Sequence, residues 1–472
     1  MSGLVRSLLG VAISAAAYYI STGLGTFWPA AWIAPIPILL VAFKAPRRTG
    51  AALAMAAYFL GSLNVFTYLT NVMPVAVVVI ILLIPAVAFA LAVLAARNAE
   101  RALAPWAAAF AFPAAWTTVE FVMSGVSPHG TAASLAYSQT DVLPLLQVAS
   151  ITGIWGVTFT VTLVPSAVAV AWTRRSATAL APAIVCALAT FGYGTWRLYQ
   201  PPQTPTTIRV GLAATDRGIE EAFATEDPAK AAAAVSDYAD RIRRLAASGA
   251  QVIVLPEKFV GVTPGDSAGV LRALSDAARA AGATVVAGLN RVAVTPRHNV
   301  AVVLGPDGDL RAEYEKHHLL PGPETGYASG STPALFAGPG AQWGVAICKD
   351  LDFPAWLRRY GRGGARILAV PAWDFVRDGR LHSRMAVVRG VENGFTIVRA
   401  AQQGLLTVSD ACGRIVAETS SGNIPDALLV SDVGPGPGST FYTRAGDWFA
   451  WVILAALIGL LVASFRVERV GA

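Results

Sequence analysis

The stretch 73–96, MPVAVVVIILLIPAVAFALAVLAA, contains no charged side chain. A helix needs about 20 mainly apolar residues to cross the hydrocarbon core of a bilayer. The stretch therefore predicts a transmembrane helix, which makes the chain a membrane protein. Pro85 lies inside the stretch, and proline is tolerated there because neighbouring helices can satisfy the carbonyl that it leaves without a donor.

Similar apolar stretches lie on both sides of this one. The predicted spans within residues 1–200 are seven, at about 4–22, 26–43, 50–70, 73–96, 102–123, 144–172 and 178–199, and an eighth runs from 448 to 465. The stretch 144–172 is long enough for a tilted span with an extra interfacial turn. The first stretch resembles a signal peptide, but six further spans follow it, so we expect it to be retained.

The composition agrees with this assignment. Of the 472 residues, 55% are hydrophobic and 14% are charged, and the mean hydropathy is +0.54. These values exclude an intrinsically disordered chain and argue against a purely soluble protein. The three cysteines are too few for a disulfide framework.

The basic residues of the membrane half alternate from loop to loop. Loops that we assign to the cytoplasm carry arginine or lysine, whereas those around 23–25, 71–72 and 124–143 carry neither. By the positive-inside rule, both termini are expected in the cytoplasm and the segment between the last two spans outside it. The net charge of +7 then reflects membrane topology, and we do not expect nucleic-acid binding. The cytoplasmic basic residues are Arg6, Lys44, Arg47, Arg48, Arg97, Arg101, Arg174, Arg175, Arg466 and Arg469.

Residues 205–440 have a different pattern, in which short β-rich runs alternate with alanine-rich amphipathic ones. This alternation predicts a single α/β domain with a layered sheet, inserted before a last span within 445–466. Tight turns are expected at 305–309 and 410–413. The predicted strands are 208–214, 251–256, 283–289, 299–305, 343–348, 366–371, 395–400 and 404–409, and the predicted helices are 228–248, 266–281, 353–362 and 382–393.

Three ionisable residues stand where strand-like runs stop. Glu257 follows VIVLP, Lys316 follows LRAEYE, and Cys348 closes WGVAIC. The carboxyl ends of strands are where ligand sites form in α/β sheets. Taken singly, each residue has an ordinary explanation: a solvated glutamate, a lysine in a charge run, and a small buried cysteine.

Together these residues resemble the Glu-Lys-Cys triad of the nitrilase, or carbon–nitrogen hydrolase, superfamily. The matching stretches are LPEKF (255–259), YEKHHLLPGPE (314–324) and ICKDLDFP (347–354). The spans resemble the apolipoprotein N-acyltransferase family, through Trp116, Glu120, AYSQ at 136–139, Pro144, Gln147, Gly153 and Gly156. The resemblance implies a membrane domain of about eight spans joined to a nitrilase-like αββα sandwich.

The resemblance also implies roles for individual residues. Glu257 would take the thiol proton, Cys348 would attack an ester carbonyl, and Lys316 would stabilise the oxyanion, assisted by the backbone N–H of Lys349. Glu324 would hold the lysine or the cysteine in place. Supporting or substrate-binding roles are expected for Glu324, Lys349, Asp350, Trp373, Glu120, Tyr137 and Gln139.

The implied reaction moves an acyl chain from a phospholipid to Cys348 as a thioester, with ping-pong kinetics. The chain would then pass to the N-terminal amine of a diacylglyceryl-cysteine lipoprotein. The resemblance implies no metal and no organic cofactor. The expected location is the bacterial inner membrane, with the catalytic domain on the periplasmic side, and a monomer is the default expectation.

Several positions depart from the family pattern. Lys349 and Asp350 stand where the family usually has an aromatic residue and glutamate, and Ser127–Gly130, Pro371–Phe375 and Arg399–Gly404 also differ. These departures leave two alternatives: a membrane-anchored amidase of nitrilase fold that hydrolyses a C–N bond, and a non-enzymatic sensor or transporter.

Further residues have open interpretations. His317 or His318 is a candidate base for a papain-like arrangement with Cys348, but the strand-end Glu and Lys would then be unexplained. The helix at 382–393 carries Arg389, Glu392 and Asn393, and either braces the site or lies on the surface. The loops 259–266 and 320–332 are candidates for a mobile lid.

Overall fold

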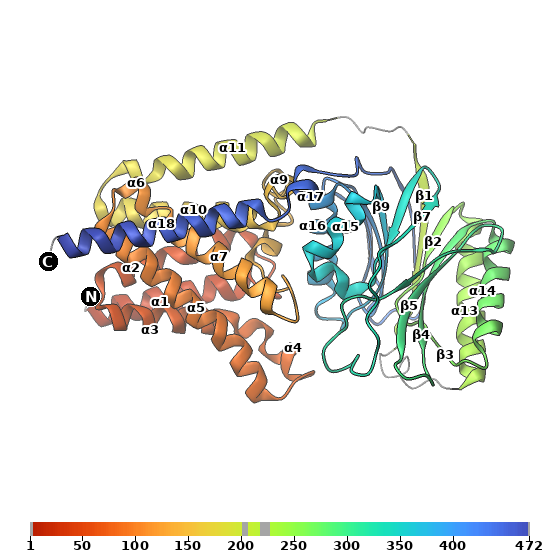
Figure 1. Ribbon diagram of the computed structural model, residues 1–472. Coiled ribbons are helices and arrows are strands. Elements are labelled where there is room, and N and C mark those ends of the chain that lie inside the picture. Colours follow the sequence, from red (N-terminus) through yellow and green to blue (C-terminus); the bar gives the residue numbers. More distant parts are fainter. Residues whose placement is uncertain (1–2, 201–205, 218–226, 471–472) are drawn as a thin grey trace. The chain divides into compact units, whose positions relative to one another are not determined.

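The computed structural model describes residues 3–200, 206–217 and 227–470 (Figure 1). The chain divides into two compact units. The first comprises Met1–Tyr199 together with Asp447–Ala472, and the second comprises Gln200–Gly446. Residues 201–205, at the boundary between the two predicted domains, lie outside the described ranges.

The described part of the first unit consists of helices and their connections. The longer helices are α1 (Gly3–Ser21), α3 (Arg47–Gly61), α5 (Val75–Ala102), α7 (Ala111–Val126), α10 (Ile154–Arg174), α11 (Ala181–Leu198) and α18 (Trp448–Val470). The shorter ones are α2 (Pro35–Lys44), α4 (Phe66–Thr70), α6 (Pro105–Ala108), α8 (Leu143–Leu146) and α9 (Ala149–Thr152). Short 3₁₀ turns are η1 (Trp28–Trp32), η2 (Ser62–Val65), η3 (Leu135–Gln139) and η4 (Ala177–Leu180).

Six described segments are long and apolar enough to cross a membrane: Gly3–Ser21, Arg47–Thr70, Val75–Ala102, Ile154–Arg174, Ala177–Leu198 and Trp448–Val467. They coincide with six of the eight predicted spans. The predicted spans 26–43 and 102–123 are each divided, the first into η1 and α2 and the second into α6 and α7. Proline fits the first turn of a helix, and Pro35 and Pro105 each begin a new one.

The stretch 144–172, expected to hold a tilted span and an extra interfacial turn, is divided into three helices. The chain forms α8 and α9 first, and α10 begins only at Ile154. Gly153 separates them with a φ of +66°, a left-handed conformation that glycine adopts without steric cost. In α10, 83% of the most apolar window is buried, against 17–39% in the other five candidate spans, so α10 is the innermost of the six.

The second unit contains two β-sheets. The first sheet has the strand order β13-β1-β2-β4-β5-β6, with β3 also paired to β4, and the second has the order β12-β11-β10-β9-β8-β7. The strands of the first sheet are β1 (Ile208–Ala214), β2 (Val252–Val254), β3 (Val260–Val262), β4 (Thr284–Arg291), β5 (His298–Leu304), β6 (Leu310–Glu315) and β13 (Ala427–Val433). Those of the second are β7 (Ala334–Gly338), β8 (Ala341–Val345), β9 (Ile367–Trp373), β10 (Thr396–Gln402), β11 (Leu405–Ser409) and β12 (Ile415–Ser420).

Helices cover the outer faces of both sheets. Figure 1 shows α13 (Pro228–Ala247) and α14 (Ser267–Ala281) on one side of the sheets and α15 (Pro354–Arg362) and α16 (Gly379–Asn393) on the other. A short helix, α17 (Phe441–Ala445), follows β13. The four layers confirm the predicted nitrilase-like α/β sandwich.

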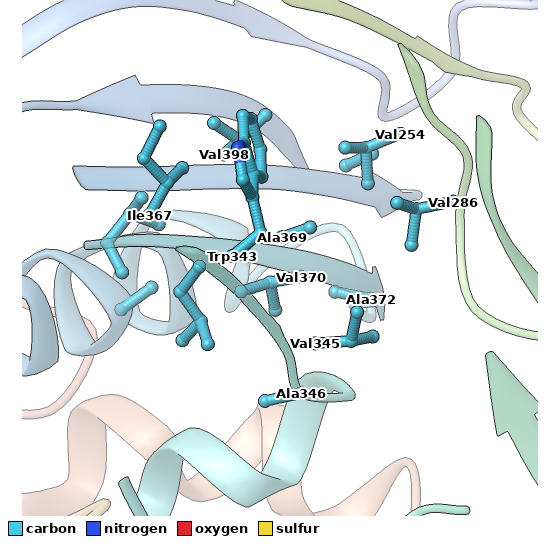
Figure 2. Packing of buried hydrophobic residues seen from close by; sticks show 14 of the residues in the cluster. Val254, Val286, Trp343, Val345, Ala346, Ile367, Ala369, Val370, Ala372 and Val398 are labelled. Carbon is cyan, nitrogen blue, oxygen red and sulfur yellow. The ribbon is translucent and has the colours of Figure 1, made fainter. Parts of the chain in front are cut away.

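The apolar core between the sheets explains why the layers hold together. Val254 and Val286 from the first sheet belong to the same buried cluster as Val345 and Ala369 from the second (Figure 2). All eight predicted strands are present. They could be predicted because strands buried on both faces have nearly continuous apolar sequences. The turns at 305–309 and 410–413 also join antiparallel strands as predicted.

Candidate active site

Lys316 brings two distant carboxylates together. It follows β6, and its Nζ donates to Glu257 Oε1 at 2.8 Å and to Glu324 Oε2 at 2.9 Å. Glu257 follows β2, and Glu324 lies in the loop after β6. All three side chains are at most 4% exposed. The structure thus assembles three of the predicted site residues into one buried ionic group.

Two further members of this group were not predicted. Asn299 on β5 donates its Nδ2 to Glu257 Oε1 at 2.6 Å and to Glu324 Oε1 at 2.7 Å. Lys258 forms an ion pair with Glu324 Oε1 and lies over the ring of Tyr327, 4.7 Å from its centroid. Asn299 could have been noticed in the sequence because it is a polar residue at the start of an apolar strand. Lys258 could have been noticed because it is next to Glu257.

The charges in this group stabilise one another. Burial disfavours the charged form of Lys316, but Glu257 and Glu324 raise its pKa well above the usual range. Burial opposes the ionisation of Glu324 too, yet Lys316 and Lys258 lower its pKa to about 2. Burial lowers the pKa of Lys258, with the two carboxylates acting in the opposite direction.

Cys348 lies at a strained point of the backbone. It follows β8 and Ile347, and it begins the 3₁₀ turn η5 (Cys348–Asp352) with a φ of +40°. Non-glycine residues in the left-handed region cost about 1–2 kcal/mol and cluster at functional sites. The Sγ donates to the carbonyl of Trp373 at 3.4 Å. Burial and Glu257 raise the pKa of the thiol, whereas Lys316 acts to lower it.

Asp350 connects the turn that carries Cys348 to the strand that precedes Lys316. Its Oδ2 accepts from Ile347 N at 3.0 Å and Tyr314 Oη at 2.7 Å, and its Oδ1 accepts from His318 N at 2.8 Å. β6 belongs to the first sheet and β8 to the second, so this fully buried carboxylate links the two sheets beside the site. The Asp in place of the usual Glu therefore serves as a brace here.

The two histidines are occupied by other contacts. The ring of His317 stacks on Trp356 at 3.7 Å, and that of His318 stacks on Phe353 at 3.6 Å. His318 Nδ1 also lies 3.3 Å from Asp350 Oδ1. The papain-like alternative gains no support, because the hydrogen bond of Cys348 Sγ within the described residues goes to Trp373.

The second sheet supplies a buried ion pair near the thiol. Arg399 on β10 holds Asp374 through two bonds, Nη1–Oδ2 at 2.9 Å and Nη2–Oδ1 at 2.5 Å. Asp374 follows Trp373, whose Nε1 donates to Gln403 Oε1 at 3.2 Å. Lys349, next to the cysteine, is buried and pairs with Asp352 at 3.1 Å.

The helix α16 is not a surface helix. Arg389 and Glu392 are fully buried and lie 2.9 Å apart, and Asn393 is fully buried as well. Asn393 Oδ1 accepts from the hydroxyl of Thr443 at 3.2 Å, which ties α16 to α17. These contacts rule out the surface interpretation, and a role in bracing the site stays a prediction.

The remaining predicted residues lie in the helical unit. Glu120 is buried on α7, where its carboxylate accepts from Trp116 Nε1, Ser134 Oγ, Leu135 N and Thr158 Oγ1 at 2.7–3.1 Å. Tyr137 Oη lies 2.6 Å from Thr131 Oγ1, and Gln139 accepts from Trp32 Nε1 at 2.8 Å. These three side chains hold α7, η3 and their neighbours together.

Both candidate lids make backbone hydrogen bonds, and their motion stays a prediction. Residues 260–262 form β3, which pairs with β4. The loop 320–332 is held by backbone hydrogen bonds from Arg297 N to Gly326 O at 3.0 Å and from Ala328 N to Arg297 O at 2.8 Å.

In the described residues no three His, Cys, Asp or Glu side chains are grouped so that they could hold a metal ion.

Comparison with known families assigns both units. Residues 198–423 match the family model described as carbon-nitrogen hydrolase, and residues 14–167 match the apolipoprotein N-acyltransferase N-terminal domain. A variant of the amidase from Nesterenkonia sp. AN1 superposes with a TM-score of 0.44 at 21% identity, covering 54% of this chain and 99% of the amidase.

Whole-length relatives agree with the two family models. The apolipoprotein N-acyltransferase of Geobacter metallireducens is 30% identical over 93% of this chain and 91% of its own length. That of Bradyrhizobium diazoefficiens is 27% identical over 86% and 81% of the respective chains. The agreement extends over both units and not over the α/β domain alone. This chain therefore belongs to the apolipoprotein N-acyltransferase family.

Proposed function

We propose that the protein transfers an acyl chain from a phospholipid to the N-terminal amine of a lipoprotein. The observation that carries the proposal is the convergence of Lys316 with Glu257 and Glu324, in a chain of this family. Cys348, in a strained turn, lies within electrostatic range of Glu257 and Lys316. In this proposal Glu257, Lys316 and Cys348 are the catalytic residues.

The first half-reaction forms a thioester. Glu257 accepts the proton of Cys348, and the thiolate attacks the ester carbonyl of the phospholipid. Lys316 has three N–H bonds, of which two are directed at the carboxylates of Glu257 and Glu324. The third, with the backbone N–H of Lys349, stabilises the oxyanion. Collapse of the intermediate breaks the ester C–O bond, and Glu257 returns the proton to the lysophospholipid oxygen.

The second half-reaction consumes the thioester. The amine of the diacylglyceryl-cysteine attacks the thioester carbonyl, and Glu257 takes its proton. The C–S bond then breaks, the amide forms, and Cys348 recovers its proton. Because the first product leaves before the second substrate reacts, the kinetics are ping-pong. The residues suffice for these steps without a metal or an organic cofactor.

The proposal includes an arrangement in a bacterial inner membrane. We assign eight spans, of which seven form a membrane domain over 1–200 and the eighth lies within 445–466, after a catalytic domain at 205–440. The divided segments η1–α2 and α6–α7 are counted as two of the spans. The alternation of basic loops favours cytoplasmic termini and a periplasmic catalytic domain. Such a domain meets both substrates without lifting their acyl chains into water, which costs about 0.8 kcal/mol per methylene.

The experiment combines purified protein with phospholipid and an S-diacylglyceryl peptide. We expect an acyl adduct on Cys348 by intact mass, acylated peptide as product, and neither with Cys348→Ala. Turnover of an amide without peptide acylation would instead indicate the amidase. If no acyl adduct forms and no amide is turned over, both enzymatic assignments are contradicted and a sensor is favoured. A reporter fused after Ala472 that proves to be external would contradict the topology.

A further inference from the structure

Lys258 has an unusual backbone and an unusual environment. It follows Glu257 with a φ of +50°, a left-handed backbone conformation that is unfavourable for a lysine. The side chain is 4% exposed, although a lysine is almost never fully buried unless it is paired. Among its partners are Glu324, by an ion pair, and the face of Tyr327.

The charge balance of the buried group depends on Lys258. Glu257, Glu324 and Lys316 alone carry a net charge of −1, and adding Lys258 makes the group neutral. Removing a charge from a buried network leaves its partner uncompensated, which is costly in a medium of low dielectric constant. Glu324 lies between the two lysines, with Oε1 facing Lys258 and Oε2 facing Lys316.

This balance matters for a thiol that must become an anion. The charged groups that act electrostatically on Cys348 are Glu257 and Lys316, carried by the first sheet, and Asp374 and Arg399, carried by the second. Asp374 and Arg399 neutralise each other in a two-bond pair. A group with net charge −1 on the first sheet opposes the formation of a thiolate, whereas a neutral group does not.

We propose that Lys258 is a positioning residue that neutralises Glu324 and so allows Cys348 to ionise beside Lys316. Lys258 acts through Glu324 and does not touch the substrate. It also holds the loop that carries Glu324 and Tyr327, because it contacts both residues. The inference rests on the proposed role of Cys348 as nucleophile.

The test follows the ionisation of the thiol without any lipid. In a Cys186→Ser/Cys412→Ser background, the rate of Cys348 alkylation by iodoacetamide is measured against pH by intact mass. The thiolate displaces iodide and forms a C–S bond, so the rate reports the thiolate fraction. We expect Lys258→Met to raise the midpoint by about one pH unit and to slow alkylation at pH 7 several-fold. The matched control, Lys230→Met on the exposed face of α13, keeps the wild-type midpoint.

The double variant distinguishes charge balance from a merely structural role. Glu324→Gln alone removes a negative charge, so we expect a lower midpoint. Lys258→Met/Glu324→Gln restores the neutral total and should return the midpoint to near the wild-type value. An unchanged midpoint in Lys258→Met, or a double variant no closer to wild type, overturns the proposal.

The proposal can still be tested if Lys258→Met does not fold or if the protein forms no acyl adduct. If Lys258→Met does not fold, Glu324→Gln still decides, because a midpoint at or above the wild-type value contradicts the charge argument. If the midpoints shift as expected but the protein forms no acyl adduct, the role of Lys258 is supported and the proposed acyl transfer is contradicted.

Discussion

Two sets of buried carboxylates, one in each unit, are held in different ways. In the helical unit, Glu120 is held by four neutral donors, two of them hydroxyls. In the α/β unit, Glu257 and Glu324 are held by lysines. Neutral donors satisfy a carboxylate at a fixed geometry, whereas a buried cation also provides charge that a reaction can use. On the proposed function, Glu120 maintains structure, Glu257 takes part in the chemistry, and Glu324 holds the lysines in place.

The largest expected effect comes from removing the shared cation. Lys316→Met takes away the oxyanion partner and leaves two carboxylates facing each other. We expect acyl-enzyme formation, followed by intact mass, to fall about 10³-fold. The free energy of unfolding should fall by about 3–5 kcal/mol, because the buried charges lose their partner. An acyl-enzyme rate within tenfold of wild type would contradict the role of Lys316.

The corresponding test in the helical unit is a pair of substitutions at Glu120. Glu120→Ala leaves four buried donors without their acceptor and should lower the free energy of unfolding by about 3 kcal/mol. Glu120→Gln should cost only about 1 kcal/mol, because Ser134 and Thr158 can reorient their hydroxyls to accept from the new amide. Thermal unfolding in detergent measures both. A folded Glu120→Gln protein without acyl transfer would show that this carboxylate has a chemical role after all.

Acid should weaken the lysine-bound group. Against the effect of burial, Lys316 and Lys258 hold the pKa of Glu324 at about 2 in the folded protein, below the ordinary glutamate value of 4.5. The stabilisation is therefore complete above pH 4.5 and is lost as the pH falls towards 2. The stability difference between wild type and Glu324→Gln should therefore narrow by about 2 kcal/mol between pH 5 and pH 3. Denaturant unfolding at each pH measures the difference, and a constant value would contradict the ionic role.

The smallest expected effect concerns another neutral contact of the helical unit. Tyr137→Phe removes the bond between Tyr137 Oη and Thr131 Oγ1 and leaves a buried hydroxyl behind. We expect a loss of about 1 kcal/mol in stability and acyl transfer near the wild-type rate. A large loss of transfer at unchanged stability would assign Tyr137 to substrate binding.

Much of the fold could be predicted because its signals are local. Apolar runs marked eight of the thirteen described strands and the six long spans, and strand ends marked Glu257, Lys316 and Cys348. Lys258 and Asn299 were missed because their roles depend on contacts between segments far apart in the chain. The divided helices were missed because proline and glycine inside an apolar stretch do not reveal whether a helix kinks or restarts. The exposed edge strand β12 lacks an alternating apolar pattern, so it was missed as well.

The proposed nucleophile and the ionic group of Glu257, Lys316 and Asn299 belong to different sheets. Cys348 follows a strand of the second sheet, whereas Glu257, Lys316 and Asn299 are carried by the first. The side chains between the sheets, among them Val254, Val345 and Trp343, thus set the separation of the reacting groups (Figure 2). Substitutions that enlarge or shrink this interior should alter the turnover rate without touching any polar atom. Screens for heat-resistant variants would then select, unintentionally, for changed catalytic speed.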